Sequence, residues 1–242
     1  MDNYTFENYF ATENSSFAKN VCIKIAETCD SKYSPLLIYG EPGSGKTHLA
    51  KAIEGYIKSQ YNDKTVKYID ADCFTENIIL SMKPLLPNNH LILRATYNTA
   101  DIFIFDGLEK IQNRDTSKEE LLNIIKQLNK DNKTIILTSA LATECLFNDY
   151  YGLKRIVESS YLVRLDKQEP LAIDFLIEAD LLEGCSLSDE LLWFIKRNCG
   201  DKVTKAKGMI NTISMWMDIN KREPSQKELQ YMFDIPDVEG CE

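Results

Sequence analysis

The sequence predicts an α/β domain, with a parallel five-stranded sheet flanked by helices, followed by a small all-helical domain. Short apolar runs alternate with amphipathic helical patterns over residues 1–168. Strands separated by helices in this way are typical of a parallel sheet that is covered on both faces. A glycine-rich segment joins the first strand to the next helix, whereas residues 169–242 carry helical patterns alone. We therefore expect two domains, with a boundary near residue 168.

Five apolar segments are expected to form the strands of the sheet. Each contains four or five residues, which suits a buried strand and is too short for a stable helix. They occupy residues 36–39, 66–69, 102–105, 134–137 and 161–165.

Helical patterns precede and separate the strands. Apolar residues recur at helical spacing in residues 15–29, 46–61 and 75–85, which places them on one face of each helix. The last of these helices is expected to end at Pro84, because proline lacks the amide hydrogen that a helix interior uses.

The helix after the third strand has a predicted start. Thr116 and Ser117 are each followed three residues later by a glutamate, Glu119 and Glu120. This spacing is the signature of a capping box, in which the two side chains bond reciprocally to backbone N–H groups. We expect the helix to begin at one of these residues and to continue through Leu128.

The C-terminal part of the chain has a different character. Beyond Pro170, helical patterns cover residues 171–182, 188–198, 203–219 and 225–233. Short connections between helices favour neighbours that pack against one another, so a small helical domain is predicted.

The composition narrows the function classes. Among 242 residues, 28 basic and 37 acidic side chains give a formal net charge of −9, which disfavours strong non-specific binding to duplex DNA. No apolar run approaches the ~20 residues of a membrane span. The N-terminus, MDNYTFENYF, lacks the basic and apolar regions of a targeting signal. We expect a cytoplasmic protein that does not associate with membranes.

Cysteine chemistry is expected to be limited. The seven cysteines form no C-x-x-C pair, and the chain has two histidines, so neither a disulfide framework nor a zinc site is predicted. We expect most of the cysteines to be buried as small apolar side chains.

The glycine-rich segment fits the pattern G-x-x-x-x-G-K-[ST] of a phosphate-binding loop, and it lies between a strand and a helix as that motif requires. Backbone N–H groups of such a loop converge on phosphate oxygens, the lysine reaches the β- and γ-phosphates, and the hydroxyl can hold Mg²⁺. The residues expected to bind a nucleotide are Gly40, Glu41, Pro42, Gly43, Ser44, Gly45, Lys46, Thr47 and His48.

A carboxylate is expected beside this loop. Asp106 directly follows the apolar strand 102–105, and open α/β sheets bind ligands at the carboxyl ends of their strands. Thr47 and Asp106 are therefore the predicted Mg²⁺ residues. Many hydrolysing enzymes of this kind place a second acid directly after the first, where this chain has Gly107.

These motifs and further segments resemble the AAA+ ATPases, and within them the family of the bacterial replication initiator DnaA and its shorter relative Hda. The matching segments are Y-T-F-E-N-Y at 4–9, N-S-S-F-A at 14–18, Y-S-P-L-L-I-Y-G at 33–40 and G-K-T-H-L at 45–49. The resemblance covers the ATPase core and lid. It implies a phosphate-loop AAA+ fold, ATP or ADP as the ligand, and Mg²⁺ as the metal ion.

The resemblance also implies where the adenine base lies. The family places the base between the N-terminal segment and the helical lid, so Phe10, Asn14 and Ser15 are its expected neighbours. For Phe10, a role in the apolar core is an equal alternative.

In the lid that the resemblance implies, a threonine occupies the position where the family has a basic residue. Gly208 aligns with a family glycine, which puts Thr204 at the position of a sensor arginine. Lys202 or Lys205 is the expected substitute, although an ammonium lacks the planar fork of a guanidinium.

The hydrolytic machinery departs from the family pattern. Gly107 replaces the second acid, and Ala140 follows the first-sensor strand 136–139 where initiators have Asp. With Thr204 in the lid, these substitutions predict binding with slow hydrolysis, because positioning and charge stabilisation supply most of the catalysis of phosphoryl transfer. Glu109 is the alternative carboxylate for orienting a water molecule.

Residues 153–156, L-K-R-I, resemble the family's short helix that presents an arginine finger to a neighbouring nucleotide. Arg155 is therefore the candidate residue acting in trans, with an ordinary surface arginine as the alternative interpretation.

Direct recognition of a duplex origin sequence is not expected, whereas binding of single-stranded DNA is left open. About 22 residues follow Asn220, too few for the family's helix-turn-helix domain. Between the second and third strands, where initiators contact single strands, Lys83 and Arg94 are the only cations, whereas a single-strand groove needs a basic track with aromatic residues.

The favoured function is nucleotide-gated regulation of bacterial replication initiation, through another AAA+ protein such as the initiator or through self-assembly. The replicative helicase and the sliding clamp are alternative partners. Three other functions remain open: a helicase loader with an active ATPase, a small-molecule phosphate-loop kinase, and a scaffold that has lost its ligand.

Overall fold

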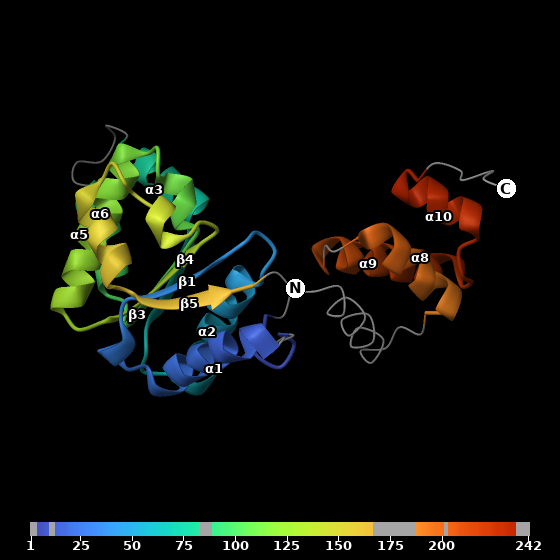
Figure 1. Cartoon of the computed structure of the whole chain (residues 1–242), viewed down its shortest axis with the longest axis horizontal. Helices are drawn as coiled ribbons and strands as arrows, with labels where there is room; N and C mark the ends of the chain where they lie inside the picture. Colours follow the sequence, from blue (N-terminus) through green and yellow to red (C-terminus); the bar gives the residue numbers. More distant parts are fainter. Residues whose placement is uncertain (1–3, 10–12, 83–88, 167–186, 201–202, 236–242) are drawn as a thin grey trace. The chain divides into compact units, whose positions relative to one another are not determined.

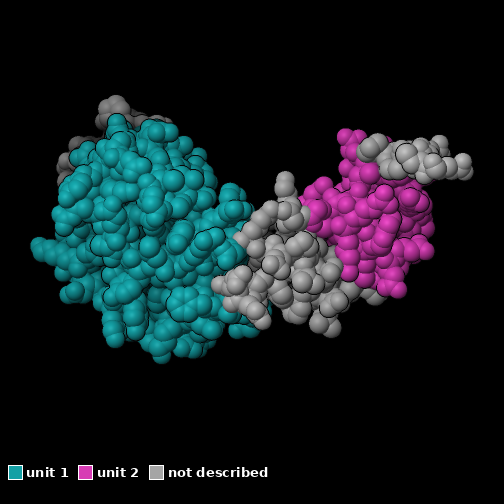
Figure 2. All heavy atoms as spheres, in the orientation of Figure 1, with its two compact units in different colours: residues 1–167 teal, residues 168–242 magenta. Residues whose placement is uncertain are grey.

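The computed structural model describes residues 4–9, 13–82, 89–166, 187–200 and 203–235. The chain divides into two compact units, residues 1–167 and residues 168–242 (Figure 2). The helix predicted at 171–182 lies outside the described residues.

The first unit contains the predicted parallel five-stranded sheet. Its strands have the order β2-β3-β4-β1-β5, and every neighbouring pair is parallel. Strands β3 and β4 are buried throughout. The strands are β1 (Leu36–Gly40), β2 (Val66–Asp70), β3 (Ile102–Asp106), β4 (Thr134–Ser139) and β5 (Tyr161–Leu165).

Helices cover both faces of this sheet (Figure 1). Because successive side chains of a strand point to opposite faces, Leu37 and Phe103 belong to one core and Ile38 and Ile104 to the other. The first core includes side chains from α3 (Ala71–Ser81), α4 (Asn89–Asn98), α5 (Asp115–Lys130) and α6 (Tyr151–Ser159), and the second from α1 (Glu13–Thr28) and α2 (Lys46–Gln60). Short 3-10 turns occupy η1 (Ser31–Tyr33), η2 (Leu108–Ile111) and η3 (Thr143–Cys145).

The predicted capping box of α5 is wrong. The helix begins at Asp115 after Arg114, whose side chain makes no capping hydrogen bond. Ser117 is instead buried, with Oγ 3.3 Å from Thr75 Oγ1 of α3. Glu120 accepts two hydrogen bonds from the Arg94 guanidinium of α4, at 2.6 and 2.8 Å. Ser117 and Glu120, which a capping box would have required, therefore contact neighbouring helices and not the backbone at the start of α5.

Helix α4 was not predicted. Its apolar run Leu-Ile-Leu at 91–93 is too short to distinguish a helix from a strand by periodicity. The side chains that decide the matter, such as Tyr97, are buried against residues of other elements, including Phe74 and Phe103.

The structure describes five of the seven cysteines. Cys22 and Cys199 are buried, Cys29 is half-buried, and Cys73 on α3 and Cys145 on η3 are exposed. Cys185 and Cys241 lie outside the described residues, so the expectation that most cysteines are buried stays a prediction.

The second unit is helical in its described part. It contains α8 (Asp189–Cys199), α9 (Val203–Asn220) and α10 (Gln226–Phe233), which share an apolar core. A capping box opens α10, where the Ser225 backbone N–H donates to Glu228 Oε2 at 2.8 Å. No described helix is long and apolar enough to cross a lipid bilayer.

Candidate functional site

The glycine-rich loop connects β1 to α2, as the motif predicts. Lys46 Nζ donates to the carbonyl oxygens of Gly40 and Glu41, each at 2.7 Å, and lies 3.3 Å from Ser44 Oγ. Burial lowers the pKa of the Lys46 ammonium, and the carboxylates of Glu109 and Asp106 oppose this shift. The ammonium is thus held over the loop, at the amino end of a helix that favours anions.

Two glycines of the loop are required by close packing. A β carbon at Gly40 would lie 2.0 Å from the carbonyl oxygen of Leu165 on β5. A β carbon at Gly45, where φ is +95°, would lie 2.7 Å from Tyr9 Cε2. The loop therefore fits tightly between the edge of the sheet and the N-terminal segment.

The N-terminal segment is anchored by His48. Its Nε2 donates to the carbonyl oxygen of Thr5 at 2.8 Å, and the rings of Tyr4 and Tyr9 meet the imidazole edge-on at 5.2 Å. The His48 ring, predicted as a nucleotide neighbour, thus packs against this segment. Ser15 is buried in α1. Phe10 and the side chain of Asn14 lie outside the described part of the structure.

The predicted pair Thr47 and Asp106 is brought together. Thr47 Oγ1 donates to Asp106 Oδ2 at 2.8 Å, because α2 begins beside the carboxyl end of β3. Two residues that the sequence did not single out complete the arrangement: Tyr68 Oη donates to the same Oδ2 at 2.8 Å, and Thr138 Oγ1 donates to Oδ1. Thr138 Oγ1 also accepts the N–H of Gly107 at 2.9 Å.

The Asp106 carboxylate is 9% exposed at the residue level and is held by hydroxyl groups. Burial and the nearby carboxylate of Asp106 raise the pKa of Tyr68, so its hydroxyl remains a hydrogen donor. The sequence signal for Tyr68 was its position near the carboxyl end of a predicted strand, whereas Thr138 belongs to the segment 136–139 that resembles the family's first-sensor strand.

The oxygen atoms at this point suit Mg²⁺. The Thr47 hydroxyl directs its hydrogen to Asp106 and keeps lone pairs for a cation. Among the described residues, no group of three or more His, Cys, Asp or Glu side chains is arranged to hold a metal ion. Mg²⁺ is commonly bound by one or two carboxylates together with water and substrate phosphates, rather than by an all-protein cage, so the donor set fits this ion.

One carboxylate lies beside both positions where the family resemblance leads us to expect an acid. Glu109 Oε2 accepts the N–H of Ala140 at 2.9 Å. A β carbon added at Gly107 would lie 3.8 Å from Glu109 Oε1. Glu109 is half-buried on η2, so it can supply negative charge to the end of the sheet that lacks the second acid.

Arg155 lies on the exposed side of α6. Leu153 and Val157 are buried on the opposite side of this helix, and the neighbouring Lys154 bonds to the carbonyl oxygen of Thr143 at 3.1 Å. The Arg155 guanidinium lies 5.9 Å from the centre of the exposed Tyr151 ring. Arg155 can therefore reach a molecule that approaches α6.

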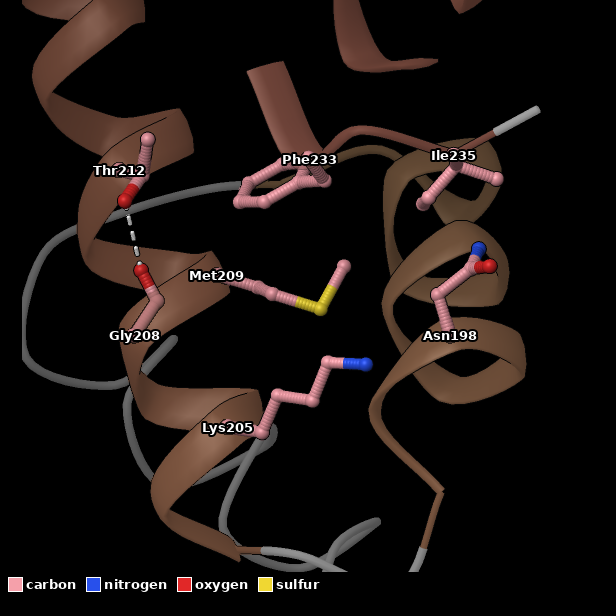
Figure 3. Close-up of a pocket in the computed structure, with 7 residues that line it drawn as sticks. All are labelled: Asn198, Lys205, Gly208, Met209, Thr212, Phe233 and Ile235. Carbon is pink, nitrogen blue, oxygen red and sulfur yellow. Dashed lines mark hydrogen bonds between the residues drawn. The ribbon is translucent and has the colours of Figure 1, made fainter. Parts of the chain in front are cut away.

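The second unit contains a pocket of about 330 Å³ (Figure 3). Lys205 of α9 extends along its lower side toward α8, and Met209 lies one turn further on (Figure 3). The cavity is lined by Asn198, Lys205, Gly208, Met209, Thr212, Phe233 and Ile235. Lys202 and the side chain of Thr204 lie outside the described residues.

Arg94, one of the two cations noted between the second and third strands, forms an ion pair within the protein. The Arg94 guanidinium forms its two-fold ion pair with Glu120 across α4 and α5. Lys83 lies outside the described residues. The described part of this segment therefore lacks an unpaired arginine or lysine for a phosphate backbone.

Comparison with known proteins relates this geometry to a family. Residues 1–148 match the family model of the bacterial DnaA ATPase domain. The chromosomal replication initiator protein DnaA of Oenococcus oeni is 28% identical over 221 residues, which are 88% of this chain and 47% of that protein. The chain spans about half the length of the curated relatives it matches.

Solved structures of the same family share the fold. Domain III of DnaA from Thermotoga maritima superposes with a TM-score of 0.85 at 25% identity, over 97% of both chains. AMPPCP-bound DnaA from Aquifex aeolicus gives a TM-score of 0.74 at 25% identity, over 88% of this chain and 65% of that one. The chain has the AAA+ fold and belongs to the family of bacterial DnaA ATPase domains.

Proposed function

We propose that this protein binds ATP or ADP with Mg²⁺, hydrolyses ATP slowly, and regulates bacterial replication initiation through contact with another AAA+ protein. The observation that carries the proposal is the hydrogen bond between Thr47 and Asp106 beside the Lys46 ammonium. A phosphate loop, its lysine, a hydroxyl and a strand-end carboxylate are together the components that bind a nucleotide with its metal ion.

Nucleotide binding is supported by the loop and by a relative. Backbone N–H groups of the loop and the positive end of α2 would receive the phosphates, while Lys46 would exchange its carbonyl partners for phosphate oxygens. AMPPCP, bound by the Aquifex aeolicus relative, is a non-hydrolysable analogue of ATP.

Thr47 and Asp106 would hold Mg²⁺, with Thr47 contributing its hydroxyl oxygen and Asp106 acting directly or through water. When bound, this ion neutralises charge on the β- and γ-phosphates. Asp106 keeps the Thr47 hydroxyl oriented, because it accepts the hydrogen of that group.

Slow hydrolysis is supported by the two substituted acid positions. Gly107 and Ala140 carry no side-chain oxygen, so neither can orient a water molecule. The Glu109 carboxylate is the nearest substitute, and the N–H of Ala140 holds it by a hydrogen bond of 2.9 Å. A tethered carboxylate has less freedom to follow the attacking water, so we expect binding to persist with slow turnover.

The partner is proposed to be the DnaA initiator of the same cell or a second copy of this chain. The relatives are replication initiators, and the exposed Arg155 of α6 could approach a neighbouring nucleotide as a finger. An arginine supplied in trans stabilises the charge of the transition state in other phosphate-loop enzymes.

The proposed nucleotide site is tested by measuring bound nucleotide and released phosphate in one reaction with labelled ATP and Mg²⁺. Lys46→Ala should abolish tight binding. Lys58→Ala is the matched control, because Lys58 lies on the same helix and pairs with Glu54 at 2.6 Å, away from the loop. Unaltered protein should retain nucleotide and release little phosphate.

Two results would contradict the proposal. If the unaltered protein and Lys46→Ala bind nucleotide equally, or if neither binds it, the loop is not the nucleotide site that we propose. Rapid release of phosphate by the unaltered protein, without a partner, would show that Glu109 or another group activates water efficiently.

A further inference from the structure

The hydroxyl of Tyr68 has a specific place at the proposed metal site. Its Oη donates to Asp106 Oδ2 at 2.8 Å, the same oxygen that accepts the hydrogen bond of Thr47. The opposite oxygen, Oδ1, accepts from Thr138. Three hydroxyl groups from three different elements thus converge on one carboxylate: Tyr68 from β2, Thr47 from α2 and Thr138 from β4.

The parallel register of the sheet explains how Tyr68 reaches this carboxylate. Tyr68 lies opposite Ile104, and Asp70 lies opposite Asp106. Because side chains alternate along a strand, Ile104 and Asp106 point to the same face. The Tyr68 ring packs against the apolar core of that face, so its hydroxyl extends along the sheet toward the carboxyl end of β3.

The Tyr68 ring is also held from the side of α2. Lys51 Nζ lies 5.7 Å from the centre of the Tyr68 ring and 4.8 Å from the centre of the Tyr4 ring. Lys51 is one helical turn after Thr47, and residues four apart share a face of a helix. The helix that supplies the Thr47 hydroxyl therefore also braces the tyrosine.

A carboxylate oxygen has two in-plane lone pairs, and at Oδ2 they are used by Thr47 and Tyr68. Removing the phenolic hydroxyl would leave one of them without a donor and would weaken the constraint on rotation of the carboxylate. The Thr47 hydroxyl, whose lone pairs are proposed to meet Mg²⁺, would then lose its fixed acceptor.

We propose that Tyr68 is a positioning residue for Mg²⁺: it fixes the Asp106 carboxylate so that Thr47 presents its oxygen to the ion. This inference rests on the proposed function, and it concerns binding of the metal rather than chemistry. Groups that orient metal ligands through hydrogen bonds typically change metal affinity by about 10- to 100-fold when removed.

The test compares Tyr68→Phe with unaltered protein in titrations of fluorescent ADP, first in EDTA and then at increasing Mg²⁺. Tyr97→Phe is the matched control. Tyr97 is buried, whereas Tyr68 is half-buried; the Tyr97 hydroxyl accepts from the Asn77 amide at 3.2 Å, and its ring packs in the core on the opposite face of the sheet. Thermal unfolding of each variant reports any general loss of structure.

We expect Tyr68→Phe to raise the Mg²⁺ concentration needed for half-maximal enhancement of ADP binding by about tenfold. Affinity for ADP in EDTA should stay within about twofold of the unaltered value, and Tyr97→Phe should leave both quantities unchanged. An unchanged Mg²⁺ dependence in Tyr68→Phe would overturn the inference. Equal losses with and without Mg²⁺ would also overturn it, because they would indicate a structural role.

The inference and the proposed function can fail separately. If the unaltered protein binds ADP and Mg²⁺ enhances this binding equally in Tyr68→Phe, the inference about Tyr68 is contradicted and the proposed function is not. Absence of any ADP binding by the unaltered protein contradicts the proposed function and the inference with it.

Discussion

Restoring an acid at position 107 is the most informative perturbation of the proposed hydrolytic defect. Gly107 has φ +95°, so Gly107→Asp places a side chain in a left-handed conformation. The added β carbon would meet its nearest neighbours at 3.5–3.8 Å, which is ordinary van der Waals contact. The expected cost is therefore conformational strain alone, about 1–2 kcal/mol, and aspartate tolerates this region better than most residues.

Both the expected gain in hydrolysis rate and the charge repulsion that limits it can be estimated. A well-placed general base contributes roughly 10²- to 10⁴-fold to a rate. However, the new carboxylate would lie close to Glu109, whose Oε1 is 3.8 Å from the added β carbon. Two like charges at about 4–6 Å repel by about 3–4 kcal/mol at an effective dielectric constant of 20, and solvent around the half-buried Glu109 reduces this value.

Gly107→Asp alone is therefore expected to raise phosphate release modestly, by about tenfold, because repulsion offsets most of the benefit of the base. Combined with Glu109→Gln, it should raise release by about 10²-fold, because the repulsion is removed. The assay is single-turnover release of phosphate from saturating ATP and Mg²⁺, which separates chemistry from binding.

Gly107→Asn is the matched control, since it carries the same backbone strain without a charge. It should leave phosphate release at the level of the unaltered protein. Equal acceleration by Gly107→Asn and Gly107→Asp would show that the added carboxylate is not the cause, because the effect would then come from the backbone. A loss of release in the double variant would indicate instead that Glu109 is the group that activates water.

Three further outcomes are expected. Gly45→Ala should lower the free energy of unfolding by about 1–3 kcal/mol, measured by urea titration, because its β carbon would lie 2.7 Å from the Tyr9 ring; unchanged stability would contradict the packing described here. The pKa of Glu228 is lowered from 4.5 to about 2, first by the hydrogen bond from the Arg222 side chain and then by hydrogen bonds from the backbone and side chain of Ser225. Because the folded-state pKa is depressed, this stabilisation is present above pH 4.5 and is lost as pH falls toward 2. The decrease in melting temperature caused by Arg222→Met should therefore be largest above pH 4.5 and shrink below it, whereas a pH-independent difference would exclude the pair as its cause. Burial raises the pKa of the Cys22 thiol to about 12, so mass spectrometry should find Cys22 unlabelled by iodoacetamide at pH 8 in folded protein and labelled in urea; rapid labelling of the folded protein would show that this core is open.

Much of the fold could be predicted from the sequence because its signals are local. Apolar runs identified all five strands of the sheet, and the loop motif together with a strand-end aspartate identified Thr47 and Asp106 as a pair. Both rules depend on residues that are close in the chain or on a general property of parallel sheets.

The rest depends on contacts between distant segments. Tyr68 reaches Asp106 only because β2 pairs with β3 in one register, and a shift by one residue would turn its side chain to the other face. The expected cap of α5 failed for a related reason, since Glu120 bonds to Arg94 of another helix instead of the backbone. Local spacing carries no information about such partners.

The proposed regulation requires that bound nucleotide controls contact with another AAA+ protein. Its most direct test is association of the full chain with the DnaA initiator of the same cell, measured with no nucleotide, with ADP and with AMPPCP. We expect the affinity to differ between these nucleotide states, and we expect the difference to disappear in Lys46→Ala. The Arg155→Ala variant should still associate, but it should change the initiator's phosphate release less than the control variant Arg164→Ala does. Arg164 is an exposed arginine of β5 that pairs with Asp166 at 2.9 Å. Identical association in all three nucleotide states, or no association, would contradict nucleotide-controlled contact with the initiator.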